Sequence, residues 1–188
     1  MQTQFSEFPV PIEQISADPS PVVRPPLVED GAHIWQIAHD SGVLDANSSY
    51  AYLMWCRDFA ATSVIAEIGS TVAGFAIGYR RPEQPDTLFV WQVAVDHPYR
   101  GFGLGVTMLE QLLDNLAGQG ITALETTITA DNAVSIAMFG TLARRRGALM
   151  RDSALFETHV FPDSHQAERL YLIAPLCDST DPLATTHP

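Results

Sequence analysis

The sequence predicts a mixed α/β or α+β domain in which helices flank a central sheet. Three observations lead to this fold class. Helix and strand patterns alternate along the chain, the segment 88–95 (LFVWQVAV) is apolar almost throughout, and 46% of the 188 residues are hydrophobic. A nearly continuous apolar run is typical of a central strand buried on both faces. A chain of this size and composition is expected to form one domain around a single core.

Ten segments between the two ends carry helix or strand patterns. The first helical pattern stops at Ser41-Gly42, and a serine at 48 or 49 can cap the next one. The stretch 68–70 (IGS) is typical of a hairpin, and a turn is expected over 81–86. We therefore expect helices over 29–39, 50–59, 106–117 and 133–146, and strands over 63–67, 71–79, 88–95, 123–129, 154–156 and 170–173.

The two ends of the chain carry no sustained pattern. We expect flexible tails over 1–23 and 178–188 around a domain at 24–177. The first 11 residues do not resemble a secretory signal, and no apolar run approaches the roughly 20 residues of a membrane helix. These features predict a cytoplasmic protein without membrane contact. Cys56 and Cys177 lack metal-ligand spacing, so plain thiols and no metal site are expected.

The charge is strongly negative. The formal net charge is −12, and all ten basic residues are arginine. An acidic surface repels phosphate backbones, which argues against nucleic-acid binding. It favours a cationic substrate, because a negative field concentrates positive ligands. Solubility or genome composition explains the charge equally well, and adaptation to salt is a further hypothesis.

A glycine-rich loop follows the apolar strand and opens a helix, in the stretch DHPYRGFGLG at 96–105. Unpaired N–H groups and the helix dipole favour an anion at such a helix start. Three alternatives compete with a site of this kind. The glycine spacing does not fit a dinucleotide-binding G-x-G-x-x-G loop, and no lysine is present for a P-loop. The third alternative is a turn without a ligand.

The pattern Arg100-x-x-Gly103-x-Gly105 after an apolar strand resembles the Gln/Arg-x-x-Gly-x-Gly/Ala motif of the GNAT N-acetyltransferase superfamily. The resemblance extends over about 71–147 and includes Asn132 at the end of the next strand. It implies the GNAT fold, a mixed and mostly antiparallel sheet flanked by helices, and acetyl-CoA as co-substrate. It further implies that the apolar strand splays from its neighbour and offers backbone amides to the pantetheine arm and the thioester oxygen. The implied coenzyme contacts are Gln92, Val93, Val95, Arg100, Gly101, Phe102, Gly103, Leu104, Gly105, Asn132, Ser135 and Phe139.

One position departs from the superfamily pattern. Many members carry a tyrosine seven residues after the asparagine, which protonates the leaving thiolate. Here the residue is Phe139, which can pack against the coenzyme but cannot donate a proton. The general acid is therefore expected to be another group or solvent.

Longer stretches are similar to the L-2,4-diaminobutyrate acetyltransferases of ectoine biosynthesis. They include LDANSSY at 44–50, PDTLFVWQV at 85–93 and ARRRG at 143–147. The resemblance covers most of 27–176 and implies acetylation of the γ-amine of L-2,4-diaminobutyrate, an osmoadaptation enzyme, and a homodimer. Two alternatives remain open: an acetyltransferase for another diamino acid or polyamine, and a CoA-binding module without catalysis.

A substrate with two ammonium groups and one carboxylate requires acids and at least one donor or cation in its pocket. Asp45 can pair with an ammonium, or it can be an Asx-turn residue. Tyr50 and Trp91 can shape the pocket or face a cation, or they can be packing residues. His165 lies in a loop expected to close over the acceptor site, although a surface histidine is the alternative. The run 144–146 (RRR) can complement a helix dipole, and one of its members can bind an acidic group.

The reaction expected from these residues is direct transfer in a ternary complex. An alkyl ammonium has a pKa near ~10.4, so the enzyme must remove a proton. The candidate proton acceptors are Asp45, Glu125, His165 and ordered water, and the sequence does not choose among them. Backbone N–H groups on the strand of Val93 are expected to stabilise the oxyanion. No residue needs to act as a nucleophile, so Cys56 is expected to have no part in catalysis.

Overall fold

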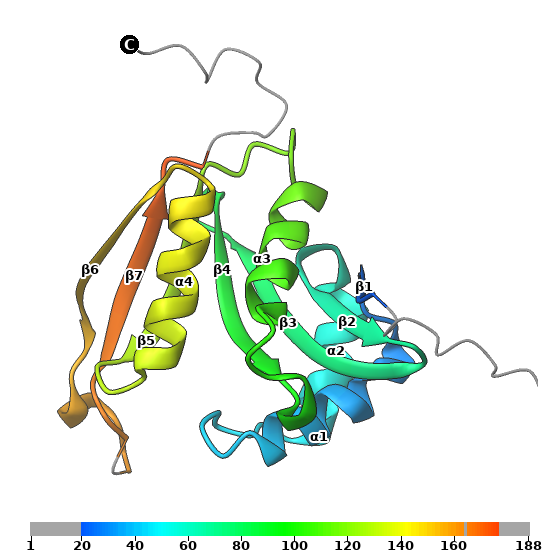
Figure 1. Cartoon of the computed structure of the whole chain (residues 1–188). Coiled ribbons are helices and arrows are strands. Elements are labelled where there is room, and N and C mark those ends of the chain that lie inside the picture. Colours follow the sequence, from blue (N-terminus) through cyan, green and yellow to red (C-terminus); the bar gives the residue numbers. More distant parts are fainter. Residues whose placement is uncertain (1–19, 164, 177–188) are drawn as a thin grey trace, which may run out of the picture.

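A computed structural model describes residues 20–163 and 165–176, which form one seven-stranded sheet flanked by helices (Figure 1). The strand order is β1-β2-β3-β4-β5-β7-β6. The strands are β1 (Val22–Arg24), β2 (Val64–Ile68), β3 (Thr71–Arg81), β4 (Gln84–Val95), β5 (Ala123–Thr129), β6 (Leu149–Phe156) and β7 (Glu168–Ala174). The α-helices are α1 (Gly31–Asp40), α2 (Ser49–Asp58), α3 (Leu104–Asn115) and α4 (Ala133–Arg145).

The pairing of β4 with β5 is the one parallel pairing in this sheet of described residues. Its ladder runs from Thr87 and Ala123 to Val90 and Thr126 and then ends. Beyond Val90 the two strands diverge, although β4 continues to Val95 and β5 to Thr129 (Figure 1). The mixed, mostly antiparallel sheet and the splayed strand are confirmed.

The buried residues of β2 and β3 belong to two separate hydrophobic cores, one on each face of the sheet. On one face, α1 and α2 bury Ile34 and Tyr52 against Phe75. On the other face, α3 and α4 bury Met108 and Phe139 against the sheet. The helices therefore lie in two layers, with α3 and α4 together on one side (Figure 1).

Most predicted elements are confirmed, and the differences have local causes. Strand β1 begins inside the predicted tail 1–23, because Val22 and Val23 pair with Glu67 and Ala66. Residues 1–19 of that tail lie outside the described residues, as does the predicted tail 178–188. The predicted turn 81–86 is shorter, since Gln84 already pairs with Arg81, and β6 begins at Leu149, before the predicted 154.

Strand β4 is not buried along both faces as predicted. Its register with β3 passes from Gln92 opposite Ile77 to Val90 opposite Gly78, which leaves Trp91 as an extra residue. Such a bulge twists a strand and redirects a side chain. Trp91 is accordingly 48% exposed.

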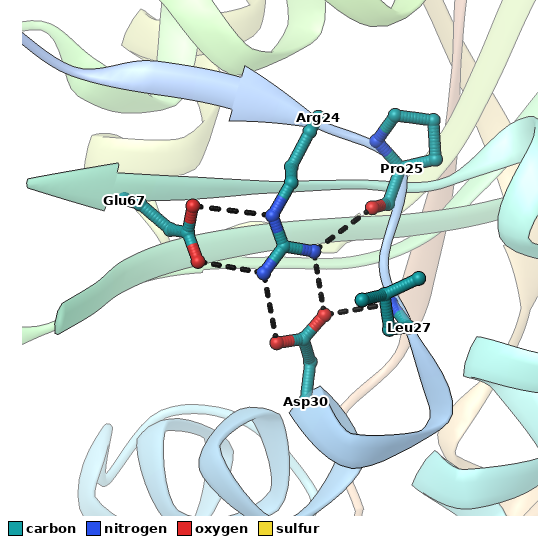
Figure 2. Close-up of polar contacts among 5 residues, drawn as sticks. All are labelled: Arg24, Pro25, Leu27, Asp30 and Glu67. Atoms are coloured by element: carbon teal, nitrogen blue, oxygen red, sulfur yellow. Dashed lines mark hydrogen bonds and ion pairs between the residues drawn. The ribbon is translucent and has the colours of Figure 1, made fainter. Parts of the chain in front are cut away.

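An arginine joins the first strand to the first helix (Figure 2). Arg24 Nη2 donates to Glu67 at 2.6 Å, and its Nη1 donates to Asp30 at 2.7 Å. The Leu27 amide also donates to the Asp30 carboxylate, at 2.6 Å. Burial opposes ionisation of Asp30, but these hydrogen bonds hold its pKa below the usual value. The network fixes the start of α1, the helix that leads into the site described next.

Candidate functional site

A cavity of about 750 Å³ lies where β4 leaves β5. It is lined by the end of β4, the glycine-rich loop, the start of α3, one face of α4 and the segment after α1. The lining residues are Ser41, Val43, Leu44, Val93, Ala94, Val95, Tyr99, Arg100, Gly101, Gly103, Leu104, Gly105, Val106, Asn132, Val134, Ser135, Ala137, Met138 and Thr141. A volume of this size accommodates an extended small-molecule ligand.

The glycine loop forms the polar wall of this cavity. Gly101 and Gly103 have φ values of 88° and 77°, a region that residues with a Cβ rarely adopt. Gly103 is the residue that caps α3, so the first unpaired N–H groups of that helix open beside it. Arg100 is anchored by its Nε, which donates to the Val95 carbonyl at 2.9 Å. The loop has the geometry of an anion site at a helix start.

Nine of the twelve expected coenzyme residues line the cavity, and three do not. The nine are Val93, Val95, Arg100, Gly101, Gly103, Leu104, Gly105, Asn132 and Ser135. Phe102 is 85% exposed, whereas Phe139 is 1% exposed within the core. Phe139 therefore belongs to the core with Leu142 and does not line the cavity.

Gln92 was expected to contact the coenzyme through its backbone, and its side chain has a separate structural role. Its side chain is buried and accepts a hydrogen bond from the Tyr52 hydroxyl at 3.0 Å. Its amide nitrogen donates to the backbone carbonyl of Asp45 at 2.9 Å. Gln92 therefore connects the buried tyrosine of α2 to the loop that carries Asp45.

Asp45 belongs to a group of three ionisable side chains, which we call the ionisable cluster: Asp45, His165 and Glu168. His165 Nε2 lies 2.9 Å from Asp45 Oδ2 and 3.8 Å from Glu168 Oε1. Glu168 begins β7 opposite Thr129, the last residue of β5. The ionisable cluster therefore lies at the diverging end of β5, beside the cavity that Leu44 and Asn132 line.

His165 makes contacts that require both ring nitrogens to carry protons. Its Nδ1 lies 2.8 Å from the Gln166 carbonyl oxygen, and its Nε2 faces the Asp45 carboxylate. Both partners accept only, so the geometry selects the imidazolium. The hydrogen bond to Gln166 and the pairing with Asp45, against some desolvation, raise the pKa of His165. Phe161 stacks on the ring at 4.4 Å and holds its orientation.

Glu168 was not among the predicted site residues. Burial raises its pKa, although His165 and Thr127 act in the opposite direction. Its Oε2 is buried and has no hydrogen-bond partner among the described residues. A buried carboxylate oxygen without a donor is costly and indicates a place for a ligand group. No local pattern marks Glu168, because only the pairing of β5 with β7 brings it to the site.

Glu125 is held away from the ionisable cluster. Its carboxylate is paired with Arg81 at 2.7 Å and is 9% exposed. It lies four residues before Thr129 on β5, which corresponds to about 13 Å along a strand. Of the candidate proton acceptors, Glu125 is therefore the one that lies apart from the ionisable cluster, with its charge compensated by Arg81.

The two aromatic residues expected at the acceptor pocket are exposed. Tyr50 is 67% exposed on the first turn of α2. Trp91 lies in a row of rings, 6.1 Å from Trp55 and 6.5 Å from Phe89. Neither lines the cavity. Trp91 is nevertheless on β4 next to Gln92, so it borders the same end of the sheet.

Two general observations concern the described part of the chain. None of its helices has the length and apolar character needed to cross a membrane. No group of three or more His, Cys, Asp or Glu side chains in 20–163 and 165–176 is arranged to hold a metal ion.

Cys56 is buried, and burial raises its pKa to about 11, so its thiol is protonated at neutral pH.

Comparison with known proteins places this geometry in a family. The model of the acetyltransferase (GNAT) family matches residues 28–143. L-2,4-diaminobutyric acid acetyltransferases of Nocardia farcinica and Streptomyces coelicolor are 57% and 56% identical to this chain, over 82% and 80% of its length and 80% and 91% of theirs. The solved diaminobutyrate acetyltransferase of Paenibacillus lautus, in complex with L-2,4-diaminobutyric acid and coenzyme A, superposes with a TM-score of 0.81. It is 34% identical, and the match covers 85% of this chain and 97% of that one. The chain therefore belongs to the GNAT acetyltransferase family and, within it, to the L-2,4-diaminobutyric acid acetyltransferases.

Proposed function

We propose that this enzyme transfers the acetyl group of acetyl-CoA to the γ-amine of L-2,4-diaminobutyrate, giving N4-acetyl-L-2,4-diaminobutyrate for ectoine biosynthesis. One observation carries the proposal: the ionisable cluster lies beside the cavity at the divergence of β4 and β5. The relative from Paenibacillus lautus, which binds the same diamino acid and coenzyme A, supports it.

The charges of the ionisable cluster complement those of the substrate. Diaminobutyrate carries two ammonium groups and one carboxylate at neutral pH. The ionisable cluster offers two carboxylates, Asp45 and Glu168, and one imidazolium, His165. We assign the α-ammonium to Asp45 and the γ-ammonium to Glu168, and the positive charge of the His165 ring attracts the α-carboxylate, since both of its N–H groups are already engaged. A substrate with the opposite balance of charges would meet repulsion in the same place.

Glu168 is our choice for the group that accepts the γ-ammonium proton. The amine attacks only when neutral, and its solution pKa near ~10.4 keeps it protonated. Glu168 has a raised pKa and a buried carboxylate oxygen that no donor engages, so it is free to accept the substrate proton. His165 is already protonated by the contacts that hold it.

The coenzyme side of the reaction depends on backbone groups. We assign the pyrophosphate to the loop Arg100–Gly105 and the thioester to the free edge of β4 at Val93 and Val95. N–H groups on that edge stabilise the oxyanion without reorganisation. A thiol has a pKa near ~8.5, below that of the attacking amine, so the thiolate can leave without a general acid. Phe139 is then compatible with catalysis.

Thiol release from acetyl-CoA tests this function directly, with diaminobutyrate, ornithine and lysine compared at equal concentration. We expect diaminobutyrate to have the highest kcat/KM and the product to carry the acetyl group on the γ-nitrogen by NMR. A preference for a longer diamino acid would replace the proposed substrate. Coenzyme binding without turnover of any amine would identify a CoA-binding module instead.

We further propose a cytoplasmic homodimer that serves osmoadaptation. Strand β6 supports the dimer, because it is the outermost strand of the sheet and is exposed over most of its length. Leu149, Leu155 and Phe156 on this strand are 60%, 41% and 47% exposed. An exposed apolar edge strand favours pairing with another chain. Sedimentation of the wild type and of a Phe156→Arg variant tests this, with a monomeric wild type as the contradicting result.

A further inference from the structure

The three consecutive arginines at the end of α4 have different partners. Arg145 Nη1 is paired with Glu110 of α3 at 2.8 Å. Arg146 Nη2 is paired with Asp114 of α3 at 2.8 Å and also donates to the Glu110 carbonyl. These two arginines join the helices α3 and α4. Their contacts explain two members of the run and leave Arg144 without a comparable role.

Arg144 folds back along α4 instead. Its Nη2 donates to the Thr141 hydroxyl at 2.8 Å, and a Cβ built on Gly140 would lie 3.7 Å from its Nη1. This is the one hydrogen bond of the Arg144 side chain within 20–163 and 165–176, and no carboxylate there pairs with it. The rest of its N–H fork faces solvent, because the residue is exposed.

Thr141, the hydrogen-bond partner of Arg144, lines the cavity. The cavity follows one face of α4 through Val134, Ser135, Ala137, Met138 and Thr141, at the spacing of a single helical stripe. Arg144 is one turn beyond Thr141 and therefore ends this stripe. The glycine loop meets this stripe at Met138, whose sulfur would lie 2.5 Å from a Cβ on Gly105. One cation, Arg100, therefore lines the cavity at its glycine loop, and a second, Arg144, lies just past its last α4 residue, Thr141.

The charges around the cavity support a role for this second cation in binding an anion. Arg100 is the only charged side chain that lines the cavity within the described residues. The chain as a whole has a formal net charge of −12, which repels an anionic coenzyme. Coenzyme A carries its pyrophosphate and, in addition, a phosphate on the ribose 3′-oxygen. The glycine loop accounts for the pyrophosphate only.

We propose that Arg144 binds the ribose 3′-phosphate of coenzyme A and makes the site selective for coenzyme A over 3′-dephospho-coenzyme A. The inference rests on the proposed function, because it requires the cavity to hold this coenzyme. A guanidinium fork matches phosphate oxygens in two parallel hydrogen bonds. The hydrogen bond to Thr141 already holds the guanidinium in place, so less side-chain entropy is lost when the phosphate binds.

Calorimetric titration of coenzyme A and 3′-dephospho-coenzyme A into the purified enzyme tests the assignment. We expect wild type to bind coenzyme A about fivefold more tightly, the upper end for an exposed ion pair. Arg144→Gln should reduce this ratio to about one by weakening coenzyme A binding alone. Arg145→Gln is the matched control on the neighbouring residue and should retain the wild-type ratio. Thermal unfolding of each variant checks that the fold is intact.

The possible failures are distinguishable. A wild-type ratio of one, or an Arg144→Gln variant that weakens both ligands equally, would overturn the role of Arg144 while leaving acetyl transfer intact. A collapse of the ratio in Arg145→Gln would move the contact to that residue and equally reject Arg144. Absence of binding of both ligands to wild type would reject the coenzyme site itself, and the role of Arg144 with it.

Discussion

The coenzyme cavity and the ionisable cluster border the same divergence of β4 and β5, but they are held in different ways. The polar wall of the cavity is one continuous segment, Arg100–Gly105, whose N–H groups are fixed by glycine backbone angles. The ionisable cluster joins side chains from segments 120 residues apart, through the pair of Asp45 and His165. Backbone donors do not titrate, whereas Glu168 and His165 do. Coenzyme binding should therefore respond to backbone changes, and acceptor chemistry to side-chain charge and pH.

Removal of the Glu168 charge is expected to have the largest effect. Glu168→Gln keeps the shape of the side chain but cannot accept the substrate proton. We expect kcat to fall by roughly 10²-fold or more, the usual contribution of a general base. Coenzyme A affinity should be unchanged, because the variant lies in the other region.

Glu125→Gln is the control for Glu168→Gln, since it changes a second buried carboxylate on the same sheet. It should lower stability by removing the one carboxylate paired with Arg81 among the described residues, while kcat stays near the wild-type value. Steady-state kinetics with diaminobutyrate and urea unfolding separate the two variants. Equal kcat for Glu168→Gln and wild type would remove Glu168 as the proton acceptor.

Two glycines test the backbone origin of coenzyme binding. Gly103 and Gly118 have φ values of 77° and 74°, and a Cβ on either would meet nothing within 4 Å. Alanine at either position should cost similar stability, about 1–2 kcal/mol, from the same backbone strain. Only Gly103→Ala should weaken coenzyme A binding, by about tenfold, because it distorts the start of α3. Calorimetry on both variants decides, and equal weakening would mean that the loop acts only through stability.

Gln92 tests how the two regions are connected. Gln92→Leu removes the bond to the Asp45 carbonyl and leaves the buried Tyr52 hydroxyl without its partner. We expect a stability loss of about 1–3 kcal/mol and a KM for diaminobutyrate raised about fivefold, with kcat little changed. Tyr52→Phe removes the same buried hydroxyl but keeps the link to Asp45, so its KM should stay near wild type. A KM raised equally in both variants would show that Asp45 is not positioned through Gln92.

The titration of the ionisable cluster predicts a pH dependence of stability. The folded-state pKa values of Glu168 and His165 are raised above the ordinary 4.5 and 6.5. A group with a raised pKa binds its proton more tightly when folded, so its stabilisation is complete below the ordinary value and is lost as pH rises through the folded one. We expect the free energy of unfolding to fall above pH 4.5 through Glu168 and above 6.5 through His165. Glu168→Gln should remove the lower decline and His165→Gln the upper one in urea titrations. A wild-type stability that rises across either window relative to its variant would contradict the assigned directions.

The same contrast explains which features the sequence could predict. The glycine loop is contiguous, so its spacing identified the cavity wall and the start of α3. The hydrogen bonds of the Gln92 side chain were not predicted, because a sequence does not show the bulge at Trp91 or which segments β4 meets in the fold. Glu168 was missed because its place depends on the register of β7 against β5. Strand β1 was missed because three residues among prolines carry too short a pattern, and pairing with β2 alone defines it.

The smallest expected effect belongs to Cys56, which lies in neither region. Direct transfer needs no protein nucleophile, and burial keeps the Cys56 thiol protonated with a pKa of about 11. Cys56→Ala should therefore leave kcat and both KM values unchanged. It should lower stability by about 1 kcal/mol, because a small gap opens between α2 and the sheet. Mass spectrometry during turnover provides the second readout, since a direct mechanism leaves no acetyl group on the protein. An acetylated cysteine, or lost kcat at retained stability, would instead place a covalent intermediate between the two regions.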